Sequence, residues 1–147
     1  MGWREKSLEE GRGARVEGVG DRGGEDMSQH SLEQFGAYRK SMELFDLVAI
    51  DMKQLKSDPL CYRLVGQQMG SADSICANIE EGHGRVSRLE YKRFLDFSRA
   101  SARETRGRYI RMKHWLSEDV IKDRTRRLDE IIGILTATIR TLKENPT

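Results

Sequence analysis

The stretch SICANIEEGHGRVSRLE, residues 74–90, contains the turn around which we expect the chain to be organised. Before the turn, small and apolar residues recur at helical spacing, and after it Ser87 and Glu90 form the Ser-x-x-Glu pattern of a capping box. Gly82 and Gly84 suit the positive φ with which helices commonly end. The stretch therefore predicts one helix that stops at Gly82 and a second that starts at Ser87.

The polar residues of this turn favour a structural role. We expect the side chains of Asn78 and Glu81 to hydrogen-bond to the turn backbone, because such groups satisfy the amides that a helix end leaves unpaired. The predicted structural set is Ser74, Asn78, Glu81, Gly82, Gly84 and Ser87.

One Glu-x-x-His motif, Glu80 to His83, has the spacing that di-iron bundles use. A carboxylate-bridged metal pair needs two such motifs and two further inward carboxylates, and the chain offers one motif, interrupted by Gly82. We therefore predict no metal site.

The same region resembles the core signature of a bacterial four-helix-bundle family, the 23S rRNA intervening-sequence proteins, which includes the accessory variability proteins of diversity-generating retroelements. The matching positions are Ser74, Ile75, Asn78, Ile79, Glu81, Gly82, Gly84, Arg85, Ser87, Phe94, Leu95, Ser101 and Glu104. The resemblance covers about residues 35–144. It implies an all-α bundle, a ring-shaped homo-oligomer that is typically a pentamer and, in one branch, binding to nucleic acid and to a reverse transcriptase. The branch stays open.

Apolar periodicity predicts four helices, over residues 31–57, 60–81, 88–116 and from 117 to near the C-terminus. Pro59 separates the first two, because the residue before a proline is pushed out of the helical region. Short connections and the absence of a strand pattern favour an all-α, up-down-up-down four-helix bundle. The expected inner stripe of the first helix is Phe35, Tyr38, Met42, Phe45, Val48, Ala49, Met52 and Leu55.

The chain of 147 residues is expected to hold one domain, over residues 31–147, behind a disordered extension over residues 1–30. Residues 1–26 contain seven glycines and few apolar residues, so burial cannot offset the entropy lost on ordering. Because Met27 directly follows Gly-Gly-Glu-Asp, whose codons can spell a ribosome-binding site, our hypothesis is that Met27 is the biological start.

Several function classes find no support in the sequence. No apolar run approaches the roughly 20 residues that cross a bilayer, and no signal peptide is evident. Cys61 and Cys76 lack a Cys-x-x-Cys spacing and are interpreted as small buried hydrophobes in a reducing compartment, so we expect a cytoplasmic protein. Neither a Ser-His-Asp or Cys-His pattern nor a phosphate-binding loop is recognisable, so we predict no enzyme, no catalytic residue and no cofactor.

Charge gives the clearest functional signal. Residues 85–113 contain ten basic and three acidic residues, a local balance of +7. Arg85, Lys92, Arg99, Arg106 and Lys113 recur every seven residues, which predicts a straight cationic ridge away from the apolar face. Most of the cations have no obvious carboxylate at helical spacing, and Arg124, Arg126 and Arg127 extend the supply on the next helix. The predicted nucleic-acid contacts are Arg85, Arg88, Lys92, Arg93, Arg99, Arg103, Arg106 and Lys113.

These observations favour a non-catalytic bundle that binds RNA or DNA electrostatically, and the resemblance adds a role as accessory subunit of a retroelement reverse transcriptase. The alternative is a structural or protein-interaction bundle whose basic face docks an acidic partner protein. A solvated helix face is the simplest interpretation of the charges in a single monomer, whose formal net charge is only +2.

Overall fold

The computed structural model describes residues 31–145, and within this range it contains helices and no strand. The long helices are α3 (Gly36–Leu55), α4 (Tyr62–His83), α5 (Arg88–Arg111) and α6 (Glu118–Glu144), and a short 3-10 helix, η1 (Met112–His114), follows α5. The prediction of an all-helical domain is confirmed for the described residues. The expected extension, with the hypothesis about Met27, lies outside them.

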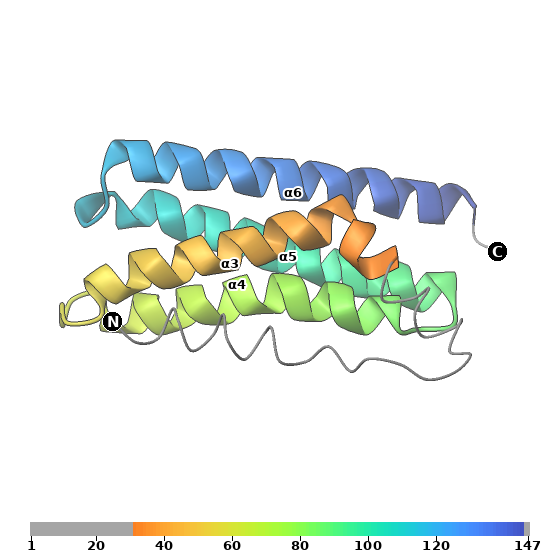
Figure 1. Cartoon of the computed structure of the whole chain (residues 1–147), viewed down its shortest axis with the longest axis horizontal. Helices are drawn as coiled ribbons and strands as arrows, with labels where there is room; N and C mark the ends of the chain where they lie inside the picture. Colours follow the sequence, from red (N-terminus) through yellow and green to blue (C-terminus); the bar gives the residue numbers. More distant parts are fainter. Residues whose placement is uncertain (1–30, 146–147) are drawn as a thin grey trace, which may run out of the picture.

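The four long helices lie side by side, and successive connections lie at alternate ends (Figure 1). Each helix packs against its neighbour in sequence, and α6 also packs against α3, so the four elements surround one core. Both Cys61 and Cys76 are buried and free, as predicted. Within residues 31–145 no helix is long and apolar enough to cross a membrane.

The first helix begins later than predicted. Residues 31–34 form a helical turn, Phe35 has extended backbone angles (φ −68°, ψ 115°), and α3 then runs from Gly36. The break allows Leu32, which is 8% exposed, to join the core. At the other end α3 stops at Leu55, ahead of the predicted position 57.

The inner face of α3 also differs from the predicted stripe. Phe35, Tyr38 and Phe45 are only partly buried, and Met42 is 45% exposed. The buried residues are Ala37, Ser41, Leu44, Val48, Asp51, Met52 and Leu55. The prediction is right for Val48, Met52 and Leu55, and it missed Ala37, Ser41 and Asp51 because this helix also turns small and polar residues inward, including one carboxylate.

The inner faces of α5 and α6 are mainly apolar. The buried residues of these two helices include Leu95, Ala102, Tyr109, Leu128, Ile131, Leu135 and Ile139. Serine caps begin both helices: Ser87 Oγ accepts a 3.1 Å hydrogen bond from the Glu90 amide, and Ser117 Oγ accepts a 3.2 Å bond from the Val120 amide. These caps confirm the predicted starts, whereas α5 ends at Arg111, five residues before the predicted end.

The turn between α4 and α5 corrects the prediction about its glycines. The helix continues through Gly82 to His83, and the capping residue Gly84 has φ −80°, so the expected positive φ is wrong. Gly82 is required for another reason: a Cβ there would lie 2.8 Å from Phe94 Cβ and 3.1 Å from Tyr91 Cδ2. The glycine therefore lets α5 approach α4 closely.

Candidate nucleic-acid interface

The row of five cations spaced seven residues apart does not form a ridge of unpaired charges, because its middle members lie along the α5–α6 contact. Lys92 and Arg99 both bind Asp96, at 3.1 and 3.0 Å. Arg99 also reaches α6, where it donates a 3.2 Å hydrogen bond to Thr136 Oγ1. Arg106 forms a fork with Asp129 of α6, with Nε–Oδ1 and Nη2–Oδ2 distances of 2.7 and 3.3 Å. Three cations of the row thus already have carboxylate partners.

Arg85, at the start of the row, lies in the turn before α5. Its guanidinium pairs with Glu81, and its Cζ lies 5.0 Å from the ring centroid of Phe94. Lys113, at the other end of the row, belongs to η1 and is exposed. The row is therefore divided between paired cations along the bundle and one exposed lysine beyond it.

The remaining predicted contacts are exposed and lack a carboxylate partner among the described residues. Arg88 donates to the backbone oxygen of Asn145 at 3.0 Å, and Arg93 lies 5.6 Å from the ring centroid of Phe97. Arg103 and Arg111 make no ion pair within residues 31–145. Along α5, Arg93, Arg103 and Arg111 are separated by about 15 Å and about 12 Å. These three arginines define what we call the outer α5 face.

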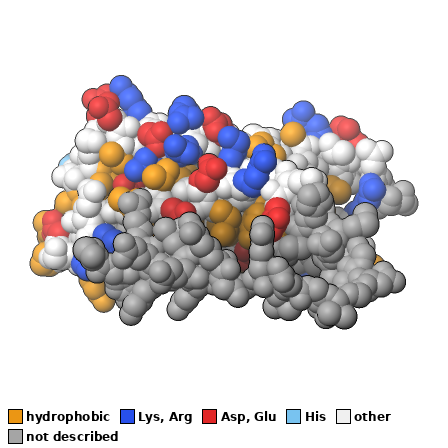
Figure 2. Space-filling view, in the orientation of Figure 1, with side chains coloured by type: hydrophobic (Ala, Val, Ile, Leu, Met, Phe, Trp, Pro, Cys, Tyr) orange, Lys and Arg blue, Asp and Glu red, His pale blue; other side chains and the backbone are white. Residues whose placement is uncertain are grey.

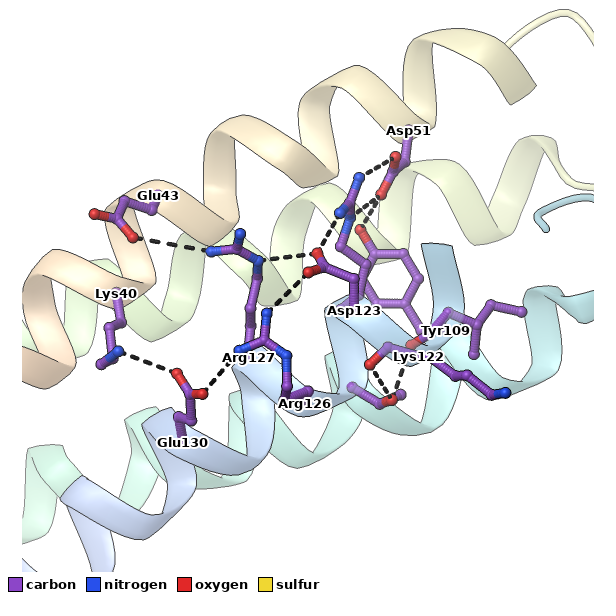
Figure 3. A network of polar contacts seen from close by, with 12 residues as sticks. Lys40, Glu43, Asp51, Tyr109, Lys122, Asp123, Arg126, Arg127 and Glu130 are labelled. Carbon is purple, nitrogen blue, oxygen red and sulfur yellow. Dashed lines mark hydrogen bonds and ion pairs between the residues drawn. The ribbon is translucent and has the colours of Figure 1, made fainter. Parts of the chain in front are cut away.

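Arg124, Arg126 and Arg127 of α6 are paired in a network of ions that extends to α3 (Figure 3). Asp123 accepts from Arg127 at 2.9 Å and from Arg126 at 3.0 Å, and it also pairs with Arg124. Arg126 continues to Glu130, which binds Lys40 of α3 at 3.0 Å. Figure 2 shows the corresponding mixture of basic and acidic side chains over this side of the bundle. Arg124, Arg126 and Arg127 therefore do not extend an unpaired cationic surface.

Electrostatics inside the network follow from these contacts. Burial acts to raise the pKa of Asp123, but hydrogen bonds from Arg127, Arg124 and Arg126 outweigh it and lower that pKa to about 2. Deeper in the bundle Arg124 binds both oxygens of Asp51, at 2.8 and 3.0 Å. Burial, followed by the hydrogen bond to Asp51, raises the pKa of Tyr109. The hydroxyl of Tyr109 therefore stays protonated and acts as a hydrogen-bond donor.

The polar turn residues make local contacts. Asn78 Nδ2 donates to the Ser74 carbonyl at 2.8 Å, one turn back in α4, and Glu81 pairs with Arg85. Asn78 thus bonds to backbone as predicted, although within α4 rather than at the turn, whereas Glu81 bonds to a side chain. Glu80 accepts a 2.8 Å bond from the Tyr38 hydroxyl. Burial and this bond raise the pKa of Tyr38 to about 12. Within residues 31–145 no group of three His, Cys, Asp or Glu side chains could hold a metal ion.

Arg108 was not among the predicted contacts, and its position sets it apart from the other arginines of α5. Only 9% of it is exposed, and its Nη1 donates to Gln67 O, Gln68 Oε1 and Ser71 Oγ, at 3.3, 2.9 and 2.9 Å. Its burial was not visible from the charge pattern, in which it counts as one of ten cations. The polar residues Gln68 and Ser71 on the inward face of α4 were the available signal.

Four packed helices and the arginines of the outer α5 face define a basic helical-bundle protein. The chain belongs to the 23S rRNA-intervening sequence protein family, whose sequence model matches residues 33–137.

The fold is shared with a solved structure. A protein of unknown function from the S23 ribosomal protein family of Bacteroides thetaiotaomicron is similar with a TM-score of 0.66 and 22% sequence identity. The similarity covers 70% of this chain and 97% of the other, which supports the fold alone. No functionally curated protein is significantly similar to the chain.

Proposed function

We propose that this protein is a non-catalytic, cytoplasmic RNA-associated bundle that contacts nucleic acid through the outer α5 face. The family name supports an association with RNA. The observation that carries the proposal is that Arg103 and Arg111 are exposed and have no carboxylate partner within residues 31–145. Of the other candidate contacts, Arg88, Arg93 and Lys113 are similarly available, whereas Arg85, Lys92, Arg99 and Arg106 would have to leave existing partners.

The spacing of these arginines suits a polyanion. A nucleic acid carries a dense row of phosphates, and each one that meets an arginine releases condensed counterions. Guanidinium groups bind phosphate oxygens in a bidentate manner, which favours arginine over lysine at such contacts. Of the three acidic residues of α5, Glu90, Asp96 and Glu104, Asp96 is already paired with Lys92 and Arg99. We expect binding that depends strongly on salt and weakly on base sequence.

The proposed working form is an up-down-up-down bundle assembled into a homopentameric ring, with a reverse transcriptase of a retroelement as one possible protein partner. Large apolar side chains that remain exposed support a further contact surface, namely Met42, Leu60, Tyr62, Val86, Leu89, Phe97 and Ile110. Light scattering at micromolar concentration should give about five times the monomer mass of 16.9 kDa. A monomer mass would remove the ring from the proposal.

A second candidate function is docking of an acidic partner protein at the α4–α5 turn. Val86 is fully exposed and Leu89 is 75% exposed, and both lie beside cations, Arg85 and Arg88. An apolar tip ringed by positive charge suits a protein surface of opposite charge. Charge reversal at Arg93 and Arg103 separates the two functions, because it should weaken RNA binding and leave docking at the tip unchanged.

The test compares charge reversal at two places. Arg93→Glu with Arg103→Glu alters the outer α5 face, while Arg140→Glu with Lys143→Glu makes the same change in charge on exposed positions of α6. Binding of a single-stranded RNA is measured at several salt concentrations by fluorescence anisotropy. The first pair should weaken binding and reduce the salt slope by about 0.7 to 0.9 for each lost contact. The control pair should change both far less. If both pairs change RNA affinity and the salt slope equally, the effect comes from the total charge of the protein, and the proposal for this face is wrong.

A further inference from the structure

A shallow depression lies on the surface at the start of α4. Its volume is about 430 Å³, which is within the range of small-molecule sites. The residues that line it are Lys56, Tyr62, Arg63, Val65, Gly66 and Gln67. Two of these six are cations, one carries an aromatic ring, and none is acidic. The depression therefore suits an anionic ligand that has a flat, partly apolar group.

Tyr62 presents an aromatic ring that the fold leaves in water. It is 75% exposed, and its hydroxyl makes no hydrogen bond within residues 31–145. The other three tyrosines are used by the bundle: Tyr38 and Tyr109 donate hydrogen bonds to carboxylates, and Tyr91 packs against the core. An aromatic side chain contributes most when its faces are covered, so the ring of Tyr62 is available for stacking with a partner.

Gly66, one turn after Tyr62, keeps a space open beside that ring. Helical side chains tilt toward the N-terminus, so a side chain at position 66 would lie next to that of Tyr62. Among the described residues, nothing lies within 4 Å of the Cβ position of Gly66, in contrast to the crowded position of Gly82. Glycine in the interior of a helix lowers stability relative to alanine, and close packing does not require it here. What Gly66 provides is access to Tyr62.

Two unpaired cations accompany the aromatic ring. Lys56 and Arg63 are exposed, and neither makes an ion pair or a hydrogen bond in the part of the chain that the structure describes. Sites for single-stranded nucleic acid combine an aromatic side chain, on which a base stacks, with cations that follow the phosphates. An acidic peptide would pair with the cations but leave the ring of Tyr62 in water. The lining therefore favours RNA over an acidic peptide.

The depression lies next to one end of the outer α5 face. The helices α4 and α5 are antiparallel, and the 3.3 Å bond from Arg108 to the Gln67 carbonyl sets their register (Figure 1). Arg63 lies one turn before Gln67 on α4. Arg111 lies about one turn after Arg108 on α5, at the same level of the bundle. An RNA strand that follows the outer α5 face to Arg111 therefore reaches the depression next.

We propose that this depression is a stacking site for an unpaired base of single-stranded RNA, with Tyr62 against the base and Lys56 and Arg63 at the flanking phosphates. The inference rests on the proposed RNA association. It adds a preference for unpaired RNA, which the arginines of the outer α5 face do not supply because paired and unpaired strands both carry phosphates.

The first test removes the aromatic ring. Tyr62→Ala should lower the affinity for a single-stranded RNA about tenfold or more, because a base stacked on an aromatic side chain contributes that much. Tyr62→Phe is the matched control: it keeps the ring and should bind as wild type does. All three proteins should bind a duplex of the same sequence equally well, since its bases are already stacked on one another. Fluorescence anisotropy measures the affinities, and circular dichroism confirms that the variants are folded.

The second test fills the space beside the ring without changing charge. Gly66→Leu introduces a strong helix former, so it should raise the melting temperature while it lowers the affinity for single-stranded RNA. Gly133→Leu makes the same change in α6, where the Cβ position also has no described neighbour within 4 Å. This control should raise the melting temperature and leave RNA affinity as in wild type. Unchanged affinity of Gly66→Leu would contradict the proposed site.

The possible results separate the stacking site from the proposed RNA association. If wild type binds single-stranded RNA and Tyr62→Ala binds it equally well, the site is overturned while the outer α5 face stands. If wild type binds no RNA, both proposals fail. An equal loss of affinity for duplex RNA or for poly-glutamate would overturn stacking of an unpaired base. A changed mass of Tyr62→Ala in light scattering would assign Tyr62 to a subunit contact instead.

Discussion

The hydroxyl of Tyr109 on α5 donates a 2.7 Å hydrogen bond to Oδ2 of Asp51 on α3, 58 residues away in the sequence. The same carboxylate receives two bonds from Arg124 of α6, so one buried acid joins three of the four helices. Asp51 is 2% exposed and Tyr109 is fully buried. The contact fixes how α3, α5 and α6 align around the core.

Replacing Asp51 should be among the most destabilising single changes. Asp51→Ala leaves Arg124 and the Tyr109 hydroxyl without their buried acceptor, and we expect a loss of about 3 to 5 kcal/mol in the free energy of unfolding. Tyr109→Phe is the matched control, because it removes one hydrogen bond and leaves the Asp51–Arg124 pair in place, at a cost of about 1 kcal/mol. Urea unfolding followed by circular dichroism measures both. Similar losses for the two variants would contradict the central role of Asp51.

Gly82 should not tolerate a side chain. Gly82→Ala places a Cβ 2.8 Å from Phe94 Cβ, so α4 and α5 must separate, at a cost of about 1 to 3 kcal/mol. Gly70→Ala provides the control within the same helix, since nothing lies within 4 Å of its Cβ position. That change should stabilise the protein by about 0.5 to 1 kcal/mol through helix propensity. Opposite shifts in melting temperature are therefore expected, and equal shifts would show that the close approach at Gly82 does not matter.

Asp123 makes stability depend on acid pH. Its pKa in the folded protein, about 2, lies below the ordinary value of 3.8, so its negative charge stabilises the fold above about pH 4. That contribution is lost as the pH falls from about 4 toward 2. Because roughly a third of the carboxylate side chain is exposed (31%), we expect only about 1 kcal/mol. Asp123→Asn should reduce stability at pH 7 and have little effect at pH 2, as denaturant titrations at both pH values would reveal. A loss of equal size at both pH values would assign the effect to packing.

Arg99 should matter for stability in a way that Arg103 does not. Arg99→Glu removes bonds to Asp96 and Thr136 and sets a carboxylate beside Asp96, so about 1 kcal/mol of stability should be lost. Arg103→Glu, at an exposed position of the same helix, should stay within about 0.5 kcal/mol of wild type. Thermal and urea unfolding of the two variants test this difference. Unchanged stability for Arg99→Glu would mean that the α5–α6 pairs are incidental.

Local sequence determined the helices and several of their ends. Ser87 and Ser117 cap α5 and α6 because a serine oxygen meets amides only two or three residues away, which is a relationship that the sequence contains in full. Leu128 and Leu135, which are seven residues apart, likewise lie on the buried face of α6. For α3 periodicity identified Val48, Met52 and Leu55 and missed Ser41 and Asp51, since small and acidic residues carry no hydrophobic signal.

Tertiary structure decided which charges are available. Asp129, Asp51 and Asp123 neutralise arginines that appeared unpaired in the sequence, because their partners come from other helices or are shared by several cations. The glycine at position 82 is required by the ring of Tyr91 and the side chain of Phe94 rather than by its own backbone angles. Arg108 became distinctive only when α4 packed against α5 and enclosed it among neutral acceptors. The sequence by itself determined where helices form and that α5 is basic; the packing of the helices decided which of its cations are left to bind a partner, because desolvation and pairing depend on neighbours that are distant in the chain.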